Sequence, residues 1–260
     1  MRKLRTWCLA AILSGAAITS ALALDMSGLI AAYPMDEGAG AKAADISGNG
    51  HDGVITDGNW VTGVYGEAVE FTGGQSHMAA DGVLSSLPNN AISLGAWFQL
   101  QAHGTYEGII GASEAGVGAV SGECCQYRLM VDPGFNPFYN AGGHRDVAVA
   151  DASVEEGVWY HYAMTIGGGA VTVYLDGQVI AESDAVNDPL PELATPLLVG
   201  TGESAGTWPL AGLVDEVFVY DRALSAAEVK EIMGASLASS TSVDARGKLP
   251  LRWAAMKSAR

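Results

Sequence analysis

Short segments that resemble β-strands, bounded by Gly, Asn or Asp, make up most of residues 28 to 221. In segment 91–100 every second residue is apolar, namely Ile92, Leu94, Ala96, Phe98 and Leu100. Segment 158–166 alternates in the same way, with Val158, Tyr160, Tyr162, Met164 and Ile166 on one face. Because successive side chains of a strand point to opposite faces, this period of two predicts half-buried β-strands. No segment between 40 and 220 has a helical period, so we expect an all-β sandwich or jelly roll.

Two local signals refine this expectation. Asp176-Gly177 lies between two apolar segments and is typical of a two-residue β-hairpin turn. Ser225-Ala226-Ala227-Glu228 has the spacing of a helix capping box, and Gly234 is a suitable stop. The sequence therefore predicts one short helix after the last strand, covering an edge or an end of a sheet.

The two ends of the chain differ from its middle. Residues 1–23 have a basic start, an apolar run and the small-residue cleavage pattern Ala21-Leu22-Ala23, as in a secretory signal peptide. The apolar run is short for a membrane span, and no later segment is longer. We expect an exported protein (extracellular, cell-surface or periplasmic) with one domain at 24–234. Residues 235–260 are predicted to be a polar linker and a basic tail, which is either a surface-retention or sorting tag or a frayed end.

Charge is unevenly distributed along the chain. Of 13 basic and 29 acidic residues, three basic ones lie in 1–23, and five basic ones and a single acid lie in 244–260. The middle therefore keeps 5 basic residues against 28 acidic ones. Such a surface repels nucleic acid and anionic membranes, and it attracts divalent cations.

Two cysteines, Cys124 and Cys125, remain after removal of the signal segment, and they are adjacent. In an oxidising compartment they form either a strained vicinal disulfide that fixes a turn or two unpaired thiols on a loop. Redox catalysis is not expected, because the Cys-x-x-Cys spacing is absent.

An ordered set of short motifs gives the chain a family resemblance. The motifs lie at 33–40, 45–53, 63–71, 92–97, 159–163, 173–177, 198–200, 210–217 and 220–225. In this order they resemble the laminin-G-like and pentraxin-like branch of the concanavalin A-like jelly-roll superfamily, over about residues 27–234. The resemblance implies a two-sheet antiparallel sandwich with one short C-terminal helix.

The resemblance also implies a calcium ion between the Asp-x-Ser-Gly-Asn-Gly loop and the Asp-Glu-Val strand. The side chains in the matching positions are Asp45, Asn49, Asp52 and Asp215. A glycine-rich loop with several oxygen-bearing side chains suits a hard cation, and the ion would be structural. The alternative is a metal-free Asx-turn loop whose backbone amides bind Asp215. An EF-hand is excluded, because its twelfth position is Thr56 rather than Glu.

Catalytic patterns are missing from the sequence. Glucanases of this architecture carry a Glu-x-Asp-x-x-Glu strand, which does not occur here, and there is no Gly-x-Ser-x-Gly elbow. Asp215 and Glu216 are adjacent and are expected to point to opposite faces of a strand. We therefore expect a non-catalytic module. The alternatives are a glycoside hydrolase with unrecognised acids and a purely structural extracellular domain.

Loop aromatics are the best candidates for ligand contact, because aromatic rings stack on sugar faces. Phe135, Phe138, Tyr139 and Trp208 are predicted to form a binding rim, the alternative being that each ring packs in the core or pins a loop. The expected partner is a glycan or an extracellular protein.

Overall fold

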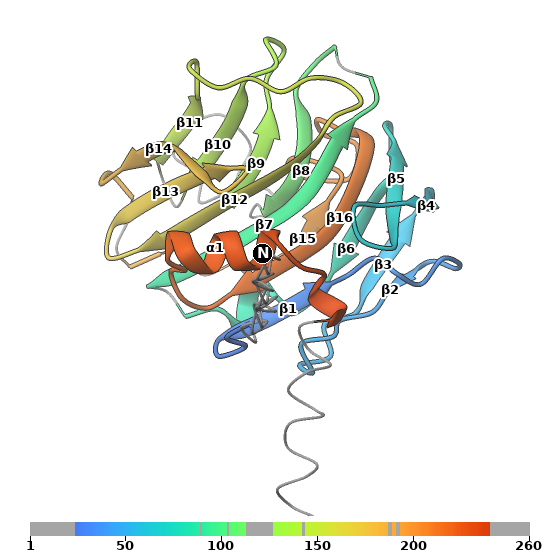
Figure 1. Cartoon of the computed structure of the whole chain (residues 1–260), viewed down its shortest axis with the longest axis horizontal. Helices are drawn as coiled ribbons and strands as arrows, with labels where there is room; N and C mark the ends of the chain where they lie inside the picture. Colours follow the sequence, from blue (N-terminus) through green and yellow to red (C-terminus); the bar gives the residue numbers. More distant parts are fainter. Residues whose placement is uncertain are drawn as a thin grey trace, which may run out of the picture.

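The computed structural model describes residues 24–88, 90–102, 104–112, 127–141, 144–186, 189–190 and 193–239. They form two antiparallel sheets of eight strands each, packed face to face (Figure 1). The predicted two-sheet jelly-roll sandwich is confirmed. The signal segment, Cys124, Cys125 and the basic tail lie outside the described residues.

The first sheet, sheet A, has the strand order β14-β13-β12-β7-β16-β5-β4, with β1 also paired to β16. Its strands are β14 Gln178–Ser183, β13 Ala170–Leu175, β12 Trp159–Gly167, β7 Ala91–Leu100, β16 Ala211–Tyr220, β5 Glu67–Thr72, β4 Gly58–Thr62 and β1 Leu29–Tyr33. Strand β16 is central, because it forms backbone pairs with β1, β5 and β7.

The second sheet, sheet B, has the strand order β11-β10-β9-β8-β15-β6-β3-β2. Its strands are β11 His144–Ala148, β10 Pro137–Ala141, β9 Tyr127–Val131, β8 Glu107–Ala112, β15 Leu197–Val199, β6 His77–Ala80, β3 Gly53–Thr56 and β2 Lys42–Ala43. A single 3₁₀ turn, Leu84–Ser86, follows β6 among the described residues.

The core lies between the sheets and uses the predicted alternation. The five apolar residues predicted to share one face of β7 are all buried. In β12 the pattern holds from Tyr160 onward, but Val158 precedes the strand and is 40% exposed. The hairpin prediction is confirmed, because Asp176 and Gly177 both have positive φ, at 49° and 68°.

The predicted helix is α1, Ala226–Met233, and its capping box is present. The Ser225 hydroxyl accepts a bond from the Glu228 amide (3.3 Å), and the Glu228 carboxylate accepts one from the Ser225 amide (2.8 Å). The helix packs over the outer face of sheet A rather than over an edge or an end (Figure 1). Its Val229 and Ile232 are buried there with Phe218.

The packed domain also extends beyond the predicted boundary at 234. Leu237, placed in the linker by the sequence, is 1% exposed and belongs to the apolar cluster under α1. No helix among the described residues is long and apolar enough to cross a membrane.

Replacing Ser225 by Ala should destabilise the domain by about 1 kcal/mol, because it leaves an amide of the first helical turn without its side-chain acceptor. The free energy of unfolding, measured by urea denaturation, should fall by that amount. Ser153→Ala, at an exposed serine outside the helix, is the control. Equal effects of the two substitutions would contradict a stabilising cap.

Candidate functional site

Asp45 lies in the loop between β2 and β3, and its carboxylate is fully engaged with protein donors. Oδ1 accepts hydrogen bonds from the amides of Ala32 (3.0 Å) and Ser47 (2.9 Å). Oδ2 accepts bonds from the Ser47 hydroxyl (2.8 Å) and the His51 amide (3.0 Å). Asp45 therefore fastens the loop to β1 through local donors, as in an Asx turn.

Asn49 and Asp52 complete this loop. The Asn49 side-chain amide donates to the carbonyls of Leu29 (3.0 Å) and Ile30 (2.9 Å). Asp52 accepts a bond from the Asp45 amide (3.0 Å) and forms an ion pair with Lys42. The Lys42 hydrogen bond lowers the pKa of Asp52. These bonds give the loop its shape from the protein's own groups.

Asp215, the fourth predicted ligand, lies on β16 and is bonded to a different loop. Its Oδ2 accepts hydrogen bonds from the amides of Val64 (2.9 Å) and Tyr65 (3.1 Å), in the turn between β4 and β5. The metal-free alternative, in which Asp215 binds amides of the 45–53 loop, is therefore wrong about the partner. The four predicted ligands are divided between two loops in their hydrogen bonding.

Glu216 does not diverge from Asp215 as the sequence predicted. The register of β16 against β7 shifts between Asp215 and Phe218, and Glu216 has a φ of 53°. Val214 and Val217 both belong to the inter-sheet core. An extra residue in a β-bulge lets both acids leave the core side of the strand. Glu216 Oε2 then accepts a bond from the Leu237 amide (2.7 Å).

Both acids are buried, Asp215 at 0% and Glu216 at 3% exposure. Among the residues that the structure describes, no donor is placed to form a hydrogen bond with Asp215 Oδ1 or Glu216 Oε1. Burial raises the pKa of Asp215 to about 7 and that of Glu216 to about 8, and the nearby Asp36 carboxylate adds to both shifts. The described residues contain no group of three or more His, Cys, Asp or Glu side chains arranged to hold a metal. As a set, the four predicted side chains do not fit a calcium site, and calcium stays a prediction.

Three part-exposed aromatic rings meet beside sheet B, and we call them the aromatic cluster: Tyr106, Phe138 and Trp208. The Tyr106 ring centroid is 5.2 Å from that of Phe138 and 6.1 Å from that of Trp208. The guanidinium carbon of Arg128 lies 4.9 Å from the Trp208 ring centroid, a cation–π distance. The sequence pointed to Phe138 and Trp208 for the rim and to Tyr106 only as one of several loop aromatics, and it gave no sign that Arg128 lies beside them.

The cluster belongs to the outer face of sheet B. Along β9, Tyr127, Leu129 and Val131 are in the inter-sheet core, so Arg128 projects to the opposite face. The loop 200–209 crosses β8 on this face. A Cβ placed on Gly108 would lie 2.1 Å from the Gly202 amide nitrogen, so only glycine permits the crossing.

Trp208 is held in an unusual conformation at the end of this loop. Its φ is 51°, a region that bulky residues rarely occupy, and its carbonyl accepts a bond from the Gly108 amide (2.9 Å). The Thr201 hydroxyl lies within hydrogen-bond distance of the carbonyls of Ser204 (2.7 Å) and Thr207 (2.8 Å), which tightens the loop. Such strain persists only where the surroundings enforce it, and it gathers at functional sites.

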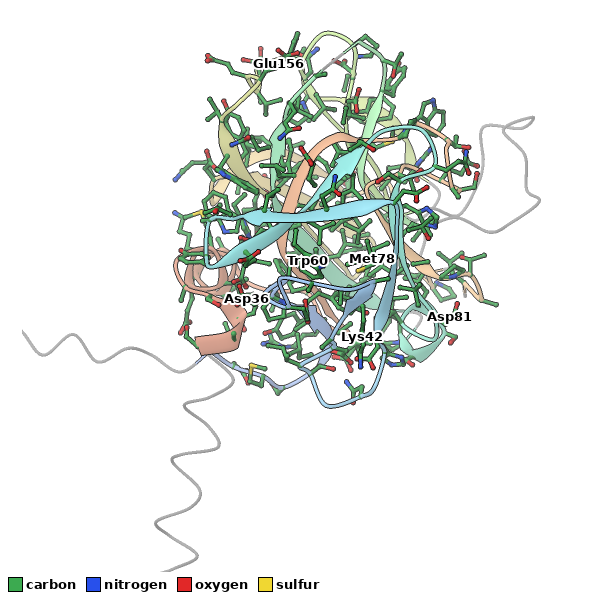
Figure 2. The ribbon with its side chains drawn as sticks, turned by 90° about the vertical axis from the view of Figure 1, so that its right-hand side faces the viewer. Asp36, Lys42, Trp60, Met78, Asp81 and Glu156 are labelled. Carbon is green, nitrogen blue, oxygen red and sulfur yellow. The ribbon has the colours of Figure 1, made fainter. Side chains whose placement is uncertain are left out.

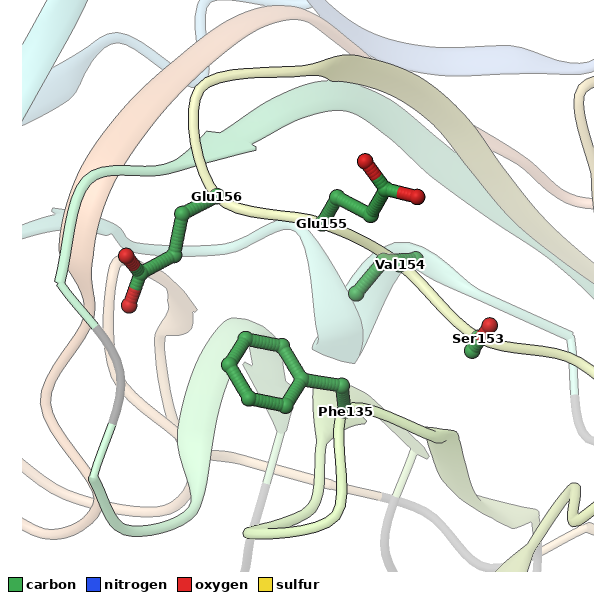
Figure 3. Close-up of a pocket in the computed structure, with 5 residues that line it drawn as sticks. All are labelled: Phe135, Ser153, Val154, Glu155 and Glu156. Carbon is green, nitrogen blue, oxygen red and sulfur yellow. The ribbon is translucent and has the colours of Figure 1, made fainter.

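The other two predicted rim residues lie elsewhere. Tyr139 is 1% exposed and packs between the sheets, so its assignment to the rim is wrong. Adjacent residues of β10 face opposite sides, so of Phe138 and Tyr139 it is Phe138 that lies on the outer face. Phe135 lines a separate open pocket of about 350 Å³ with Ser153, Val154, Glu155 and Glu156, the Phe135 pocket (Figure 3). Figure 2 shows Glu156 at the opposite end of the molecule from Asp36 and Lys42.

One serine and one histidine come close enough to suggest a nucleophile. Ser86 Oγ lies 3.4 Å from His51 Nε2. The Ser86 hydroxyl, however, donates to the Gly82 carbonyl (2.7 Å), and His51 Nδ1 faces the Asp81 carbonyl rather than a carboxylate. This geometry lacks the base orientation that an activated serine needs. The absence of catalysis stays a prediction.

The buried acids predict an inverse pH dependence of stability in chelator. A carboxyl whose pKa is raised on folding keeps its proton in the folded state after the unfolded chain has lost it. The free energy of unfolding should therefore fall as pH rises from about 5 to about 7, and Glu216→Gln should reduce this fall by about 2 kcal/mol. Urea denaturation across that range measures it, with the exposed Glu182→Gln as control. If stability instead rises with pH, Asp215 and Glu216 are ionised in the folded protein and a positive charge balances them.

Comparisons with solved structures show the same fold in several proteins. Domain 4 of AbnA, a GH43 extracellular arabinanase from Geobacillus stearothermophilus solved with arabinotriose, is 20% identical with a TM-score of 0.62, covering 78% of this chain and 97% of that domain. Trypanosoma rangeli sialidase is 18% identical with a TM-score of 0.62, covering 79% of this chain and 32% of that one. The binding domain of Paraclostridial Mosquitocidal Protein 1 is 14% identical with a TM-score of 0.58, covering 79% and 51%.

At these identities the structural likeness shows the fold alone, and the chain spans about a third of the sialidase. No curated protein sequence matches it. A family model does match, over residues 72–230, which is more than half of the chain. With the two-sheet fold, this match places the protein in the concanavalin A-like lectin/glucanases superfamily, in the family Laminin_G_3.

Proposed function

We propose that the protein is an exported, non-catalytic carbohydrate-binding module whose binding platform is the aromatic cluster. The observation that carries the proposal is the meeting of Tyr106, Phe138 and Trp208, all part-exposed, beside the Arg128 guanidinium. Aromatic rings offer apolar area to the C–H faces of sugars, and the buried Arg128 side chain, whose residue is 4% exposed, supports the Trp208 ring through its cation–π contact. A structural relative solved with arabinotriose supports this class of ligand.

The platform is largely pre-formed, which reduces the entropy lost on binding. The loop bonds fix Trp208 before any ligand arrives, and Arg128 is held from both sides by Trp208 and by Glu203, whose carboxylate is 3.9 Å away. Glu107, next to Tyr106, is directed elsewhere. Its carboxylate accepts a bond from the Ala211 amide (2.9 Å), and burial raises its pKa to about 7. Glu107 therefore links β8 of sheet B to β16 of sheet A. Because this carboxyl is used in the fold and is not directed at the aromatic cluster, a binding role is favoured over hydrolysis.

Removal of the Trp208 ring tests the platform. Trp208→Gly deletes the ring and also relieves the positive φ, so the variant should fold. Its affinity for a neutral oligosaccharide, found by glycan array and measured by calorimetry with arabinotriose as first probe, should fall at least about tenfold. Trp60→Ala, on strand β4 of the other sheet, is the control. Unchanged affinity in Trp208→Gly would exclude the cluster as the platform.

We also propose that a calcium ion beside Asp215 and Glu216 stabilises the fold and takes no part in ligand chemistry. Two buried carboxylate oxygens, Asp215 Oδ1 and Glu216 Oε1, accept no hydrogen bond from the described part of the chain, and this supports a place for a cation. Against it, the loop of Asp45 already satisfies its carboxylate. The described side chains alone supply no complete shell.

A thermal melt with calcium and with chelator decides this point. A bound structural ion should raise the melting temperature by several degrees, because a ligand that binds only the folded state stabilises it. Asp215→Asn should abolish the difference, whereas Asp184→Asn, at an exposed position, should keep it. Identical melting temperatures of the wild type with and without calcium would contradict a structural calcium site.

A further inference from the structure

The Phe135 pocket has the size and mixed lining of a ligand site and lies apart from the aromatic cluster. Its volume of about 350 Å³ falls within the usual range for small-molecule sites, about 300–1,000 Å³. Phe135 and Val154 provide apolar surface, Ser153 provides a hydroxyl, and Glu155 and Glu156 provide carboxylates. The lining residues come from two segments, the β9–β10 turn and the approach to β12.

The aromatic wall of the pocket is held in place by the turn. Phe135 has a φ of 64°, which is as unusual for a bulky residue as that of Trp208. Asp132 Oδ1 accepts bonds from the amides of Gly134 (2.8 Å) and Asn136 (3.0 Å), and this enforces the turn. The Phe135 carbonyl accepts a bond from the Val154 amide (2.9 Å), which joins the two segments. These bonds therefore fix the backbone that carries the Phe135 ring.

The charge at the pocket is negative and has no partner among the residues described. Glu155 and Glu156 are exposed, and neither forms an ion pair with a basic side chain of the described segments. In Figure 3 the Val154 side chain is directed toward the Phe135 ring, the Glu156 carboxylate lies to one side of the ring, and the Glu155 carboxylate is directed away. A cation placed at the opening would meet a carboxylate and an aromatic face together, a combination that favours ammonium groups.

We propose that the Phe135 pocket binds an ammonium-bearing saccharide, with glucosamine as the minimal unit. The sugar's C–H face lies on Phe135, its ammonium group faces Glu156, and its hydroxyls are within reach of Ser153. A hexosamine ring fills more of this pocket's volume of about 350 Å³ than an extended lysine side chain does, and this favours a saccharide over a basic peptide. The inference rests on the proposed function, because it takes a glycan as the ligand.

Calorimetric titration of the whole protein with a fully deacetylated glucosamine oligomer, in mildly acidic buffer, tests the proposal. The N-acetylated oligomer is the matched ligand, because acetylation removes the charge. Binding should be at least about tenfold weaker for the N-acetylated oligomer and for Glu156→Gln. Phe135→Gly removes the ring while relaxing its backbone, and it should also lose binding. Glu182→Gln, exposed on β14, should bind like wild type.

Three results would overturn the proposal. They are equal affinity for the two oligomers, binding that survives both Glu156→Gln and Phe135→Gly, and equally tight binding of a lysine-rich peptide at the same residues. Titration of Trp208→Gly separates this proposal from the platform. If neutral glycan binding needs Trp208 and glucosamine does not bind, the pocket proposal is wrong and the aromatic-cluster proposal stands. If glucosamine binding needs Glu156 and no neutral glycan binds at the aromatic cluster, the pocket proposal is supported and the aromatic cluster is not the binding platform.

Discussion

The burial of two adjacent carboxylates on the central strand β16 constrains much of the surrounding structure. An acid in a low-dielectric interior needs hydrogen-bond donors or a proton. Asp215 takes the amides of the β4–β5 turn, and Glu216 takes the amide of Leu237. Tyr65 in that turn donates its hydroxyl to the Met233 carbonyl at the end of α1 (3.0 Å). The edge of sheet A, the helix and the segment after it are thereby joined around one bulge.

The same strand leads directly to the aromatic cluster. β16 begins three residues after Trp208, and its first amide is bonded to Glu107 at the start of β8, in the other sheet. The loop that carries Trp208 can cross β8 because Gly108 and Gly111 have no side chains there. The cluster is therefore built by long-range contacts between rigid elements, which is how folded scaffolds commonly hold loop residues for binding.

Features that depend on a few neighbouring residues could be predicted from the sequence, whereas features that depend on tertiary packing could not. The period of two in β7, the Asp176-Gly177 turn and the Ser225–Glu228 box each depend on a few neighbouring residues, and all three are present. The bulge at Glu216 inserts one residue, and nothing in the strict alternation signals it. It reversed the expectation that the two acids diverge.

The candidate site shows the same division. Phe138 and Tyr139 differ by a single strand position, and the register decides which of them is exposed. No local pattern shows that Phe135 lies apart from Trp208. The contacts of Tyr106 and Arg128 with Trp208 depend on how β8, β9 and the 200–209 loop pack together, which the sequence does not indicate locally. Leu237, an isolated apolar residue among serines and alanines, carried no sign of its burial.

The proposed glycan site lies on the outer face of sheet B at Trp208. The most direct measurement is an NMR titration that follows the tryptophan indole N–H signals as a neutral oligosaccharide is added. Binding at the aromatic cluster should shift the Trp208 signal and leave those of Trp60 on β4 and Trp97 on β7 unchanged. A saturable shift at Trp60 or Trp97 with none at Trp208 would contradict it.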